Sequence, residues 1–183
     1  GLSSIIVKQP TCAFNDGEVQ AIGVGGSGSF EYKIDSGSYG SVFNFTELSS
    51  GNHTITINDT TTGCENSILV TLEDPTPITG LTLTPKPVSC HGGSDGSITV
   101  TIATPAPGVN DNPVYKYSID GVNFQDSNIF SGLAAGSYTV EVISGRGCVA
   151  TDSILVSEPA VIVVPTPSVT QFGCNSTNNL NNS

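Results

Sequence analysis

Short stretches in which apolar and polar residues alternate are the dominant pattern of this chain. Residues 54–57 read Thr-Ile-Thr-Ile, and residues 97–102 read Ser-Ile-Thr-Val-Thr-Ile. Alternation with a period of two places the apolar side chains on one face, as in a β-strand with one buried side. No window keeps the i, i+3, i+4, i+7 apolar spacing of an amphipathic helix. The pattern therefore predicts an all-β fold.

Runs of this kind recur along both halves of the chain, and turn-forming residues bound each of them. The predicted strands cover residues 3–8, 18–24, 30–35, 41–45, 53–58 and 67–72, then 81–85, 97–103, 114–120, 128–130, 137–143 and 153–156. Short strands separated by turn signals predict tandem immunoglobulin-like antiparallel β-sandwiches. The expected core comprises Val19, Ile22, Phe30, Tyr32, Ile34, Leu48, Ile55, Ile57, Val70, Leu72, Ile98, Val100, Ile102, Tyr115, Tyr117, Ile119, Leu133, Tyr138, Val140, Val142, Ile154 and Val156.

The two halves carry the same ordered motifs. Cys12 is followed by Asp16-Gly17, and Cys90 is followed by Asp95-Gly96. We expect both Asp-Gly pairs to form turns, because glycine reaches positive φ and aspartate bonds nearby backbone. Later in each half, a Leu-x-x-Gly segment enters an alternating run that a Gly-Cys pair follows. This order predicts a tandem array with a first repeat at residues 1–75, a second at 76–159 and the start of a truncated or divergent third at 160–183.

The spacing between repeats is constant although the repeats differ in length. The second cysteine of each repeat precedes the first cysteine of the next by 26 positions, both from Cys64 to Cys90 and from Cys148 to Cys174. A proline that follows an acidic residue lies 11 positions into each of these joints. Proline ends a strand and stiffens the chain. We therefore expect consecutive units to lie end to end with limited bending.

The cysteines suggest one disulfide in each repeat. Bonds Cys12–Cys64 and Cys90–Cys148 would close loops of 52 and 58 positions. Such loops contribute roughly 4 kcal/mol in the chain-entropy model, which suits domains as small as these. The alternative bond Cys64–Cys90 would join neighbouring repeats. We predict pairing within each repeat, with Cys174 unpaired in this chain, and hence an oxidising, extracellular compartment.

Composition narrows the range of partners. Sixteen acidic residues stand against five basic ones, which gives a formal net charge of −11. Nucleic acid is not an expected partner, because phosphate contacts need patches of Lys and Arg. The longest aliphatic run, residues 161–164, is too short to span a membrane. Mutual repulsion between acidic chains is typical of a long, exposed protein.

The motifs together resemble a known family. Cys-x3–4-Asp-Gly-[Ser/Glu]-[Ile/Val], Tyr-x-Ile-Asp, Leu-x-x-Gly-x-[Tyr/His]-Thr-[Val/Ile] and Gly-Cys occur twice in this order. The chain thereby resembles the SprB repeats of very large cell-surface adhesins in gliding bacteria. That resemblance implies a secreted, outer-surface segment, exported by the type IX secretion system and used in adhesion and gliding motility. His53 stands where the family has tyrosine, as at Tyr138, and the segment after Cys174 lacks Asp-Gly.

Enzymatic chemistry is not expected. The two histidines, His53 and His91, occupy non-equivalent positions, and no nucleophile, base and orienting group recur together. Calcium is the one metal that the acidic residues suggest, because it takes several carboxylate and carbonyl oxygens. The candidate ligands are Asp16, Asp95, Asp74 and Glu158. They do not form a complete ligand loop, so we expect no cofactor.

Two sites and two functions complete the expectations. Thr60 and Ser153 follow aspartates in a pattern typical of bacterial O-glycosylation, which makes them candidate glycan sites. We expect a non-enzymatic structural stalk segment of a large secreted adhesin or filament on the bacterial cell surface. Its partners would be neighbouring repeats of the same protein, with surface polysaccharide or self-association into fibres as further contacts. The alternative is a polysaccharide- or protein-binding β-sandwich module.

Overall fold

The computed structural model describes residues 1–103 and 114–168, which form strands, turns and loops without a helix. The strands are β1 (Leu2–Lys8), β2 (Gly17–Gly23), β3 (Phe30–Ile34), β4 (Asn44–Leu48), β5 (Gly51–Asp59), β6 (Glu65–Leu72), β7 (Leu81–Lys86), β8 (Gly96–Ile102), β9 (Tyr115–Ser118), β10 (Ile129–Leu133), β11 (Gly136–Ser144) and β12 (Val149–Val156). All of their pairings are antiparallel. The predicted all-β antiparallel fold is confirmed.

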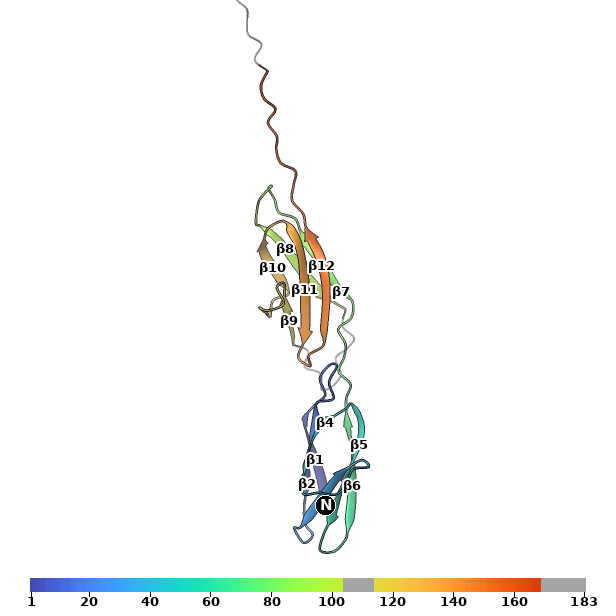
Figure 1. Cartoon of the computed structure of the whole chain (residues 1–183). Coiled ribbons are helices and arrows are strands. Elements are labelled where there is room, and N and C mark those ends of the chain that lie inside the picture. Colours follow the sequence, from blue (N-terminus) through green and yellow to red (C-terminus); the bar gives the residue numbers. More distant parts are fainter. Residues whose placement is uncertain (104–113, 169–183) are drawn as a thin grey trace, which may run out of the picture.

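Each half of the chain forms two three-stranded sheets with the same topology. In the first half the sheets have the orders β1-β2-β4 and β3-β5-β6. In the second half the orders are β7-β8-β10 and β9-β11-β12, which is the same arrangement six strands later. The two sandwiches lie end to end, and the chain leaves the second sandwich at the end far from the first (Figure 1).

A separate hydrophobic core lies between the sheets of each sandwich. The first consists of Val19, Ala21, Leu48, Ile55, Val70 and Leu72, and the second of Leu83, Val88, Ile98, Val100, Phe130, Leu133, Val140, Val142 and Val156. Ile22 was predicted in the core but is only partly buried. The period of two explains the difference, because Val19 and Ala21 share the inner face of β2 and Ile22 points to the other face. Burial of such side chains supplies the main stabilisation of each sandwich.

The Asp-Gly pairs differ from the predicted turns. Neither Gly17 nor Gly96 has a positive φ, and both are buried at the first position of a strand. A Cβ on Gly17 would lie 2.8 Å from the carbonyl oxygen of Leu48, and a Cβ on Gly96 would lie 2.8 Å from that of Leu133. The motif therefore needs glycine because two strands approach closely there, and not because of its backbone angles.

The predicted start of a third repeat, residues 160–183, is described only as far as residue 168. Residues 160–168 form no strand and are exposed. Cys174 lies outside the described residues, so its predicted unpaired state stays a prediction.

Candidate functional site: the junction between the two sandwiches

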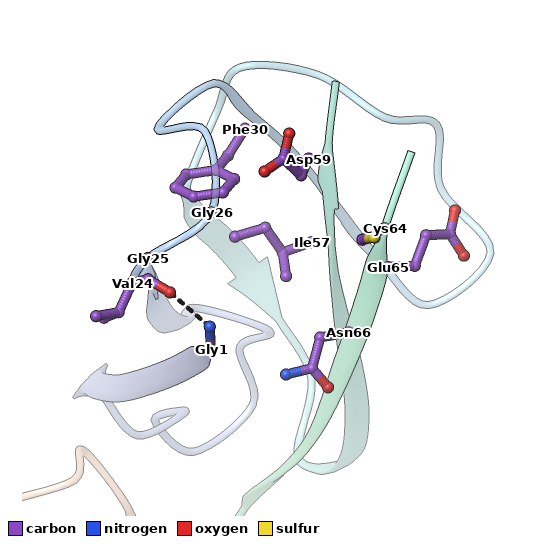
Figure 2. A pocket seen from close by; sticks show the side chains of 10 residues that line it. All are labelled: Gly1, Val24, Gly25, Gly26, Phe30, Ile57, Asp59, Cys64, Glu65 and Asn66. Carbon is purple, nitrogen blue, oxygen red and sulfur yellow. Dashed lines mark hydrogen bonds between the residues drawn. The ribbon is translucent and has the colours of Figure 1, made fainter. Parts of the chain in front are cut away.

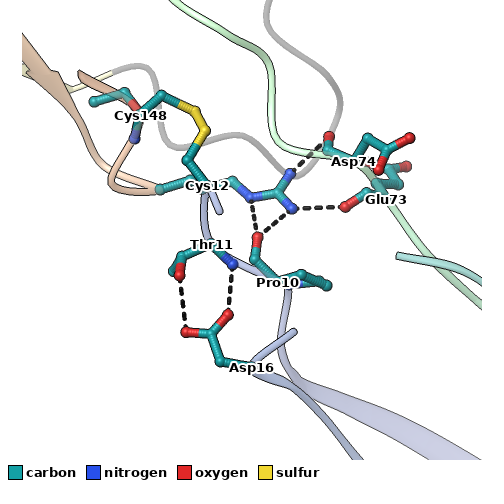
Figure 3. Close-up of a disulfide and its surroundings, with 9 residues drawn as sticks. Pro10, Thr11, Cys12, Asp16, Glu73, Asp74 and Cys148 are labelled. Atoms are coloured by element: carbon teal, nitrogen blue, oxygen red, sulfur yellow. Dashed lines mark hydrogen bonds between the residues drawn. A yellow bond between two sulfur atoms is a disulfide. The ribbon is translucent and has the colours of Figure 1, made fainter. Parts of the chain in front are cut away.

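A disulfide bond joins the two sandwiches. Cys12, in the loop between β1 and β2, is bonded to Cys148, which follows the turn between β11 and β12. Their Cα atoms are 4.9 Å apart, although the residues are separated by 136 positions in the sequence. Cys148 is buried, whereas Cys64 and Cys90 are free and exposed. The bond thus connects one repeat to the next, and Figure 3 shows it at the junction.

The predicted bonds Cys12–Cys64 and Cys90–Cys148 are therefore wrong, and strand geometry gives the reason. Cys12 lies at the end of the first sandwich where β5 begins, and Cys64 lies at the end where β5 finishes. The nine residues of β5 span about 30 Å, whereas the Cα atoms of a disulfide must lie within about 7 Å. The same distance separates Cys90 from Cys148 along β11, also nine residues long. Pairing within a repeat is geometrically excluded in both sandwiches.

Asp16 fixes the loop that presents Cys12. Its carboxylate accepts hydrogen bonds from the backbone N–H of Thr11 at 2.6 Å and from the Thr11 hydroxyl at 2.8 Å. It also accepts one from the ammonium group of Lys8 at 2.6 Å. The hydrogen bond from Lys8, followed by those from Thr11, holds the pKa of Asp16 well below its ordinary value. The aspartate of the motif thus acts as a clamp on the residue directly before the cysteine (Figure 3).

Arg146 fills the centre of the junction. It belongs to the turn between β11 and β12, and its side chain is buried. Its guanidinium donates to the carbonyl oxygen of Pro10 through Nε at 3.1 Å and through Nη2 at 2.6 Å. It also donates to the carbonyl oxygens of Glu73 at 2.6 Å and Asp74 at 3.1 Å. One side chain of the second sandwich thus binds both the cysteine loop and the outgoing end of the first.

The backbone also crosses the junction. The N–H of Cys12 donates to the carbonyl oxygen of Arg146 at 2.9 Å. On the first sandwich, the N–H of Glu73 donates to Oε1 of Gln9 at 2.9 Å, which holds the cysteine loop beside the outgoing strand end. A planar guanidinium with five donors in fixed directions suits such a set of convergent carbonyls better than an ammonium group does.

Arg146 was not among the residues that the sequence motifs singled out, although a signal was present. It is the single arginine among only five basic residues. It lies two positions before Cys148 in a turn where the first repeat has Thr62 before Cys64. This departure of the second turn from the first was the signal that could have identified Arg146.

The candidate calcium ligands are dispersed, and each has a partner within the protein. Asp16 binds Thr11 and Lys8, as described above, and its counterpart Asp95 accepts a hydrogen bond from the N–H of Ser89 at 2.9 Å. Asp74 accepts a hydrogen bond from the hydroxyl of Ser50, and Glu158 accepts one from the N–H of Gly92. In the part of the chain that the structure describes, no three His, Cys, Asp or Glu side chains come together as metal ligands.

Neither the candidate glycan sites nor the histidines belong to the set of junction residues described above. Thr60 and Ser153 are exposed, and the hydroxyls of Ser153 and Thr139 are 2.9 Å apart. His53 is buried in the first sandwich. His91 lies 3.2 Å from the carboxylate of Glu158 at the outer end of the second sandwich.

These features define a class of protein in which similar β-sandwiches follow one another along the chain and are joined by a disulfide bond. Residues 82–124 match the family model of the SprB repeat, which confirms the resemblance stated from the motifs. The matched segment contains Cys90, Asp95 and Gly96. This match indicates a cell-surface module of the adhesin type.

Comparison with other known proteins gives weaker likenesses. No curated protein matches the chain. Among solved structures, domains 4 and 5 of the S-layer protein SbsC match with a TM-score of 0.40 and 13% identity, over 87% of this chain and 98% of that one. A C-terminal 282-residue fragment of intimin, in complex with the intimin-binding domain of its translocated receptor, matches with a TM-score of 0.33 and 13% identity. That match covers 86% of this chain and 63% of the intimin chain. Residues 1–103 and 114–168 include no helix capable of crossing a membrane.

Proposed function

We propose that this chain is a non-enzymatic structural stalk segment of a large secreted adhesin or filament on the bacterial cell surface. The bond between Cys12 and Cys148 carries the proposal, because it ties one sandwich to the next and not a sandwich to itself. Arg146 adds noncovalent contacts at the same place. A segment that only binds a ligand has no need of such a reinforced junction, whereas a segment that extends under tension does.

The position of the disulfide determines how tension passes through the segment. When the two ends of the chain are pulled apart, the Cys12–Cys148 bond transmits the force, and the 136 positions between the two cysteines are not stretched. Those positions include β2 to β11, and hence most of both cores. The bond therefore gives the segment resistance to extension under load, with β1 and β12, which lie outside the bonded positions, bearing the force directly. Such resistance suits a stalk that carries load between a cell and a surface.

The SprB repeat match supports a role of this segment in adhesion and gliding motility. The family model that matches residues 82–124 is that of the SprB repeat, and resemblance to this family implies an adhesin of gliding bacteria. On this basis the segment serves adhesion and gliding motility after export by the type IX secretion system. The acidic composition, with a net charge of −11, keeps neighbouring rods apart at close range.

Single-molecule force spectroscopy tests the stalk role directly. The chain is held between its termini, and its fully extended length is measured with and without reductant. The bond between Cys12 and Cys148 hides 136 positions, so reduction should lengthen the extended chain by roughly 450–490 Å. The double variant Cys12→Ser/Cys148→Ser should show the longer length without reductant. The matched control, Cys64→Ser/Cys90→Ser, should behave like the unsubstituted chain.

Two results would contradict the proposal. One is an oxidised chain that extends as far as the reduced chain. The other is unfolding of both sandwiches at the same low force with and without the disulfide, because a stalk then gains nothing from the bond.

A binding module is the second candidate, and one exposed aromatic residue favours it. Phe14 follows the cysteine loop and is 68% exposed beside the junction. Aromatic side chains with this exposure often contact ligands at interfaces. A glycan array probed with the chain and with Phe14→Ala separates the two functions. Loss of a specific glycan signal in the variant would favour binding, and absence of any signal in both would favour the stalk.

A further inference from the structure

The loop around Cys90 is built in the same way as the loop around Cys12. Asp95 accepts a hydrogen bond from the N–H of Ser89 at 2.9 Å, just as Asp16 accepts one from the N–H of Thr11. The hydrogen bond from Ser89 keeps the pKa of Asp95 below its ordinary value, as the contacts of Asp16 do for that residue. The motif aspartate thus holds the residue before the cysteine in both loops, although the loop from Cys90 to Asp95 is one residue longer than the loop from Cys12 to Asp16.

The residues after the two prolines differ in what covers them. Ile78 lies three positions after Pro75 and packs against the core of the second sandwich. Ile162 lies three positions after Pro159 and is 91% exposed. A large aliphatic side chain in this position gains free energy when another surface covers it, because its apolar area then leaves water. The second joint thus has the same residue type at the same place as the first, without the sandwich that covers it there.

A hollow marks each of these places. At the first junction it is lined by Cys12 and Ile78 and by Cys148 of the docked turn. At the outer end of the second sandwich a hollow is lined by Cys90, His91, Val161 and Ile162 and has no docked turn. Cys90 and the aliphatic residues after Pro159 thus form a surface similar to the one that Cys12 and Ile78 form at the first junction.

We propose that the hollow at Cys90 is a docking site for the Gly-Cys turn of a following repeat, and that Cys90 forms a disulfide with the second cysteine of that repeat. The inference rests on the proposed stalk function, since it requires further sandwiches in the array. The first junction identifies the occupant, because there the Gly147-Cys148 turn seats on the equivalent surface. The spacing of 26 positions from Cys148 to Cys174 places the next cysteine loop at the same distance as in the previous joint.

Cys64, at the outer end of the first sandwich, lies in a turn built like the turn that presents Cys148. It follows Gly63 in the turn after β5, as Cys148 follows Gly147 in the turn after β11. The two glycines have nearly the same positive φ, 70° and 74°. The N–H of Asp59 donates to the carbonyl oxygen of Cys64 at 2.9 Å, and the N–H of Ser144 donates to that of Cys148 at 2.9 Å. Figure 2 shows Cys64 in this turn, beside Asp59, Glu65 and Asn66.

The bond forms by ordinary thiol–disulfide exchange. The thiolate of Cys90 attacks a small disulfide donor, such as oxidised glutathione, which releases one donor thiol and leaves a mixed disulfide on Cys90. The thiolate of the incoming cysteine then attacks the sulfur of Cys90 and releases the second donor thiol. Two protein thiols are oxidised by two electrons, and the donor disulfide is reduced to two thiols, which take up the two protons.

A chain with one added repeat tests the proposal. Residues 76–159 are duplicated, so that residues 1–159 continue directly into residues 76–183 across the existing joint. The protein is refolded in a buffer of reduced and oxidised glutathione, trapped by alkylation at acidic pH and mapped by mass spectrometry. We expect Cys12 bonded to the first copy of Cys148 and the first copy of Cys90 bonded to the second copy of Cys148. The matched control, Cys64→Ser, should leave this map unchanged.

Recovery of the first copy of Cys90 as a free thiol would overturn the proposal, as would its bond to any other cysteine. A second readout does not depend on oxidation. In the extended chain with the first copy of Cys90 changed to serine, the amide of residue 90 in that copy should gain at least tenfold protection from hydrogen exchange over the same amide of the original chain with Cys90→Ser, because the equivalent N–H of Cys12 donates to the docked turn. Equal exchange would overturn the docking site. Failure of the stalk function is seen separately, in the force measurements on the original chain.

Discussion

His53 and Tyr138 occupy equivalent positions in the two sandwiches, and each bonds the carbonyl oxygen four residues earlier. The Tyr138 hydroxyl donates to Ala134 at 3.0 Å, and Nε2 of His53 lies 2.9 Å from the carbonyl oxygen of Ser49. Two chemically different side chains thus make the same contact at this position of the pattern. Nδ1 of His53 makes a second contact, 2.8 Å from Oδ2 of Asp35. Because both ring nitrogens face acceptors, the histidine donates to both of them only when it is an imidazolium.

This pair makes the first sandwich sensitive to pH. Burial lowers the pKa of His53, but its hydrogen bonds to Asp35 and Ser49 outweigh burial and raise it above 6.5. Burial raises the pKa of Asp35, but its hydrogen bonds to His53 and Thr54 outweigh burial and lower it below 3.8. A raised histidine pKa stabilises the fold below 6.5, and this contribution is lost as the pH rises through the folded-state pKa. The lowered aspartate pKa stabilises the fold above 3.8 and is lost as the pH falls.

We therefore expect the first sandwich to be most stable between about pH 4 and 6.5 and to weaken as the pH rises above 6.5 through the raised pKa of His53. The loss should be below about 1 kcal/mol, because Asp35 is nearly half exposed and solvent screens the pair. Hydrogen exchange of the β5 amides, corrected for intrinsic rates, measures it. The variant His53→Tyr keeps the bond to Ser49 and should remove the pH dependence. Equal pH dependence in that variant would exclude the His53–Asp35 pair as the cause.

The close approach of strands at the Asp-Gly motif predicts the effect of a single methyl group. Gly17→Ala places a Cβ 2.8 Å from the Leu48 carbonyl oxygen and 2.8 Å from a methyl carbon of Leu72. We expect a loss of about 1–3 kcal/mol in the free energy of unfolding of the first sandwich, as for other overpacked cores. Gly96→Ala should do the same in the second. Urea denaturation followed by NMR resolves the two sandwiches.

Gly40→Ala is the matched control for the methyl group. Gly40 has an ordinary φ and no heavy atom within 4 Å of an added Cβ. In the variant Gly40→Ala, the free energy of unfolding of the first sandwich should change by less than about 0.5 kcal/mol, as for substitutions at other unconstrained surface positions. Similar losses in all three variants would show that glycine is needed for backbone freedom and not for space.

The clamp of Asp16 on Thr11 should govern how readily the junction forms. Asp16→Ala removes three hydrogen-bond contacts from the loop that presents Cys12. The loop then samples more conformations, so we expect slower formation of the bond between Cys12 and Cys148 in a glutathione buffer. Quenched samples separated by reversed-phase chromatography give the rate. Asp152→Ala, an exposed acid on β12, is the control. An unchanged rate in Asp16→Ala would mean that the loop is ordered without the clamp.

The fold was accessible from sequence because it depends on local periodicity. The alternation in residues 54–57 and 97–102 decides which side chains face inward, and Ile55, Ile57, Ile98 and Val100 are buried as predicted. The disulfide pairing could not be predicted in this way, because it depends on how many times the chain runs along the length of the sandwich between two cysteines. From Cys12 the chain runs along the sandwich in β2 and returns in β3 and β4, which both point toward the end where β5 begins. It then runs along the sandwich again in β5. Cys64 therefore lies at the end opposite to Cys12.

Arg146 provides the strongest prediction for the junction itself. Its guanidinium satisfies the carbonyl oxygens of Pro10, Glu73 and Asp74, and hydrogen bonds from a charged donor contribute about 1.5–3 kcal/mol each. Arg146→Thr introduces the residue of the equivalent turn in the first repeat, Thr62, which is too short to replace these bonds. We expect the junction to lose about 3 kcal/mol. Because about 1.4 kcal/mol corresponds to a tenfold change, the equilibrium constant for the Cys12–Cys148 bond should fall roughly 100-fold.

The measurement is the ratio of oxidised to reduced junction at equilibrium in defined mixtures of reduced and oxidised glutathione. It is made in a chain with Cys64, Cys90 and Cys174 changed to serine, so that only the junction cysteines exchange. Arg146→Lys keeps the charge but loses the fork of donors, so its equilibrium constant should lie between those of the other two chains. Lys116→Ala, which removes only an exposed contact to Asp126, should leave the constant unchanged. If Arg146→Thr forms the disulfide as readily as the unsubstituted chain, then the buried guanidinium has no part in fixing the arrangement of the two sandwiches.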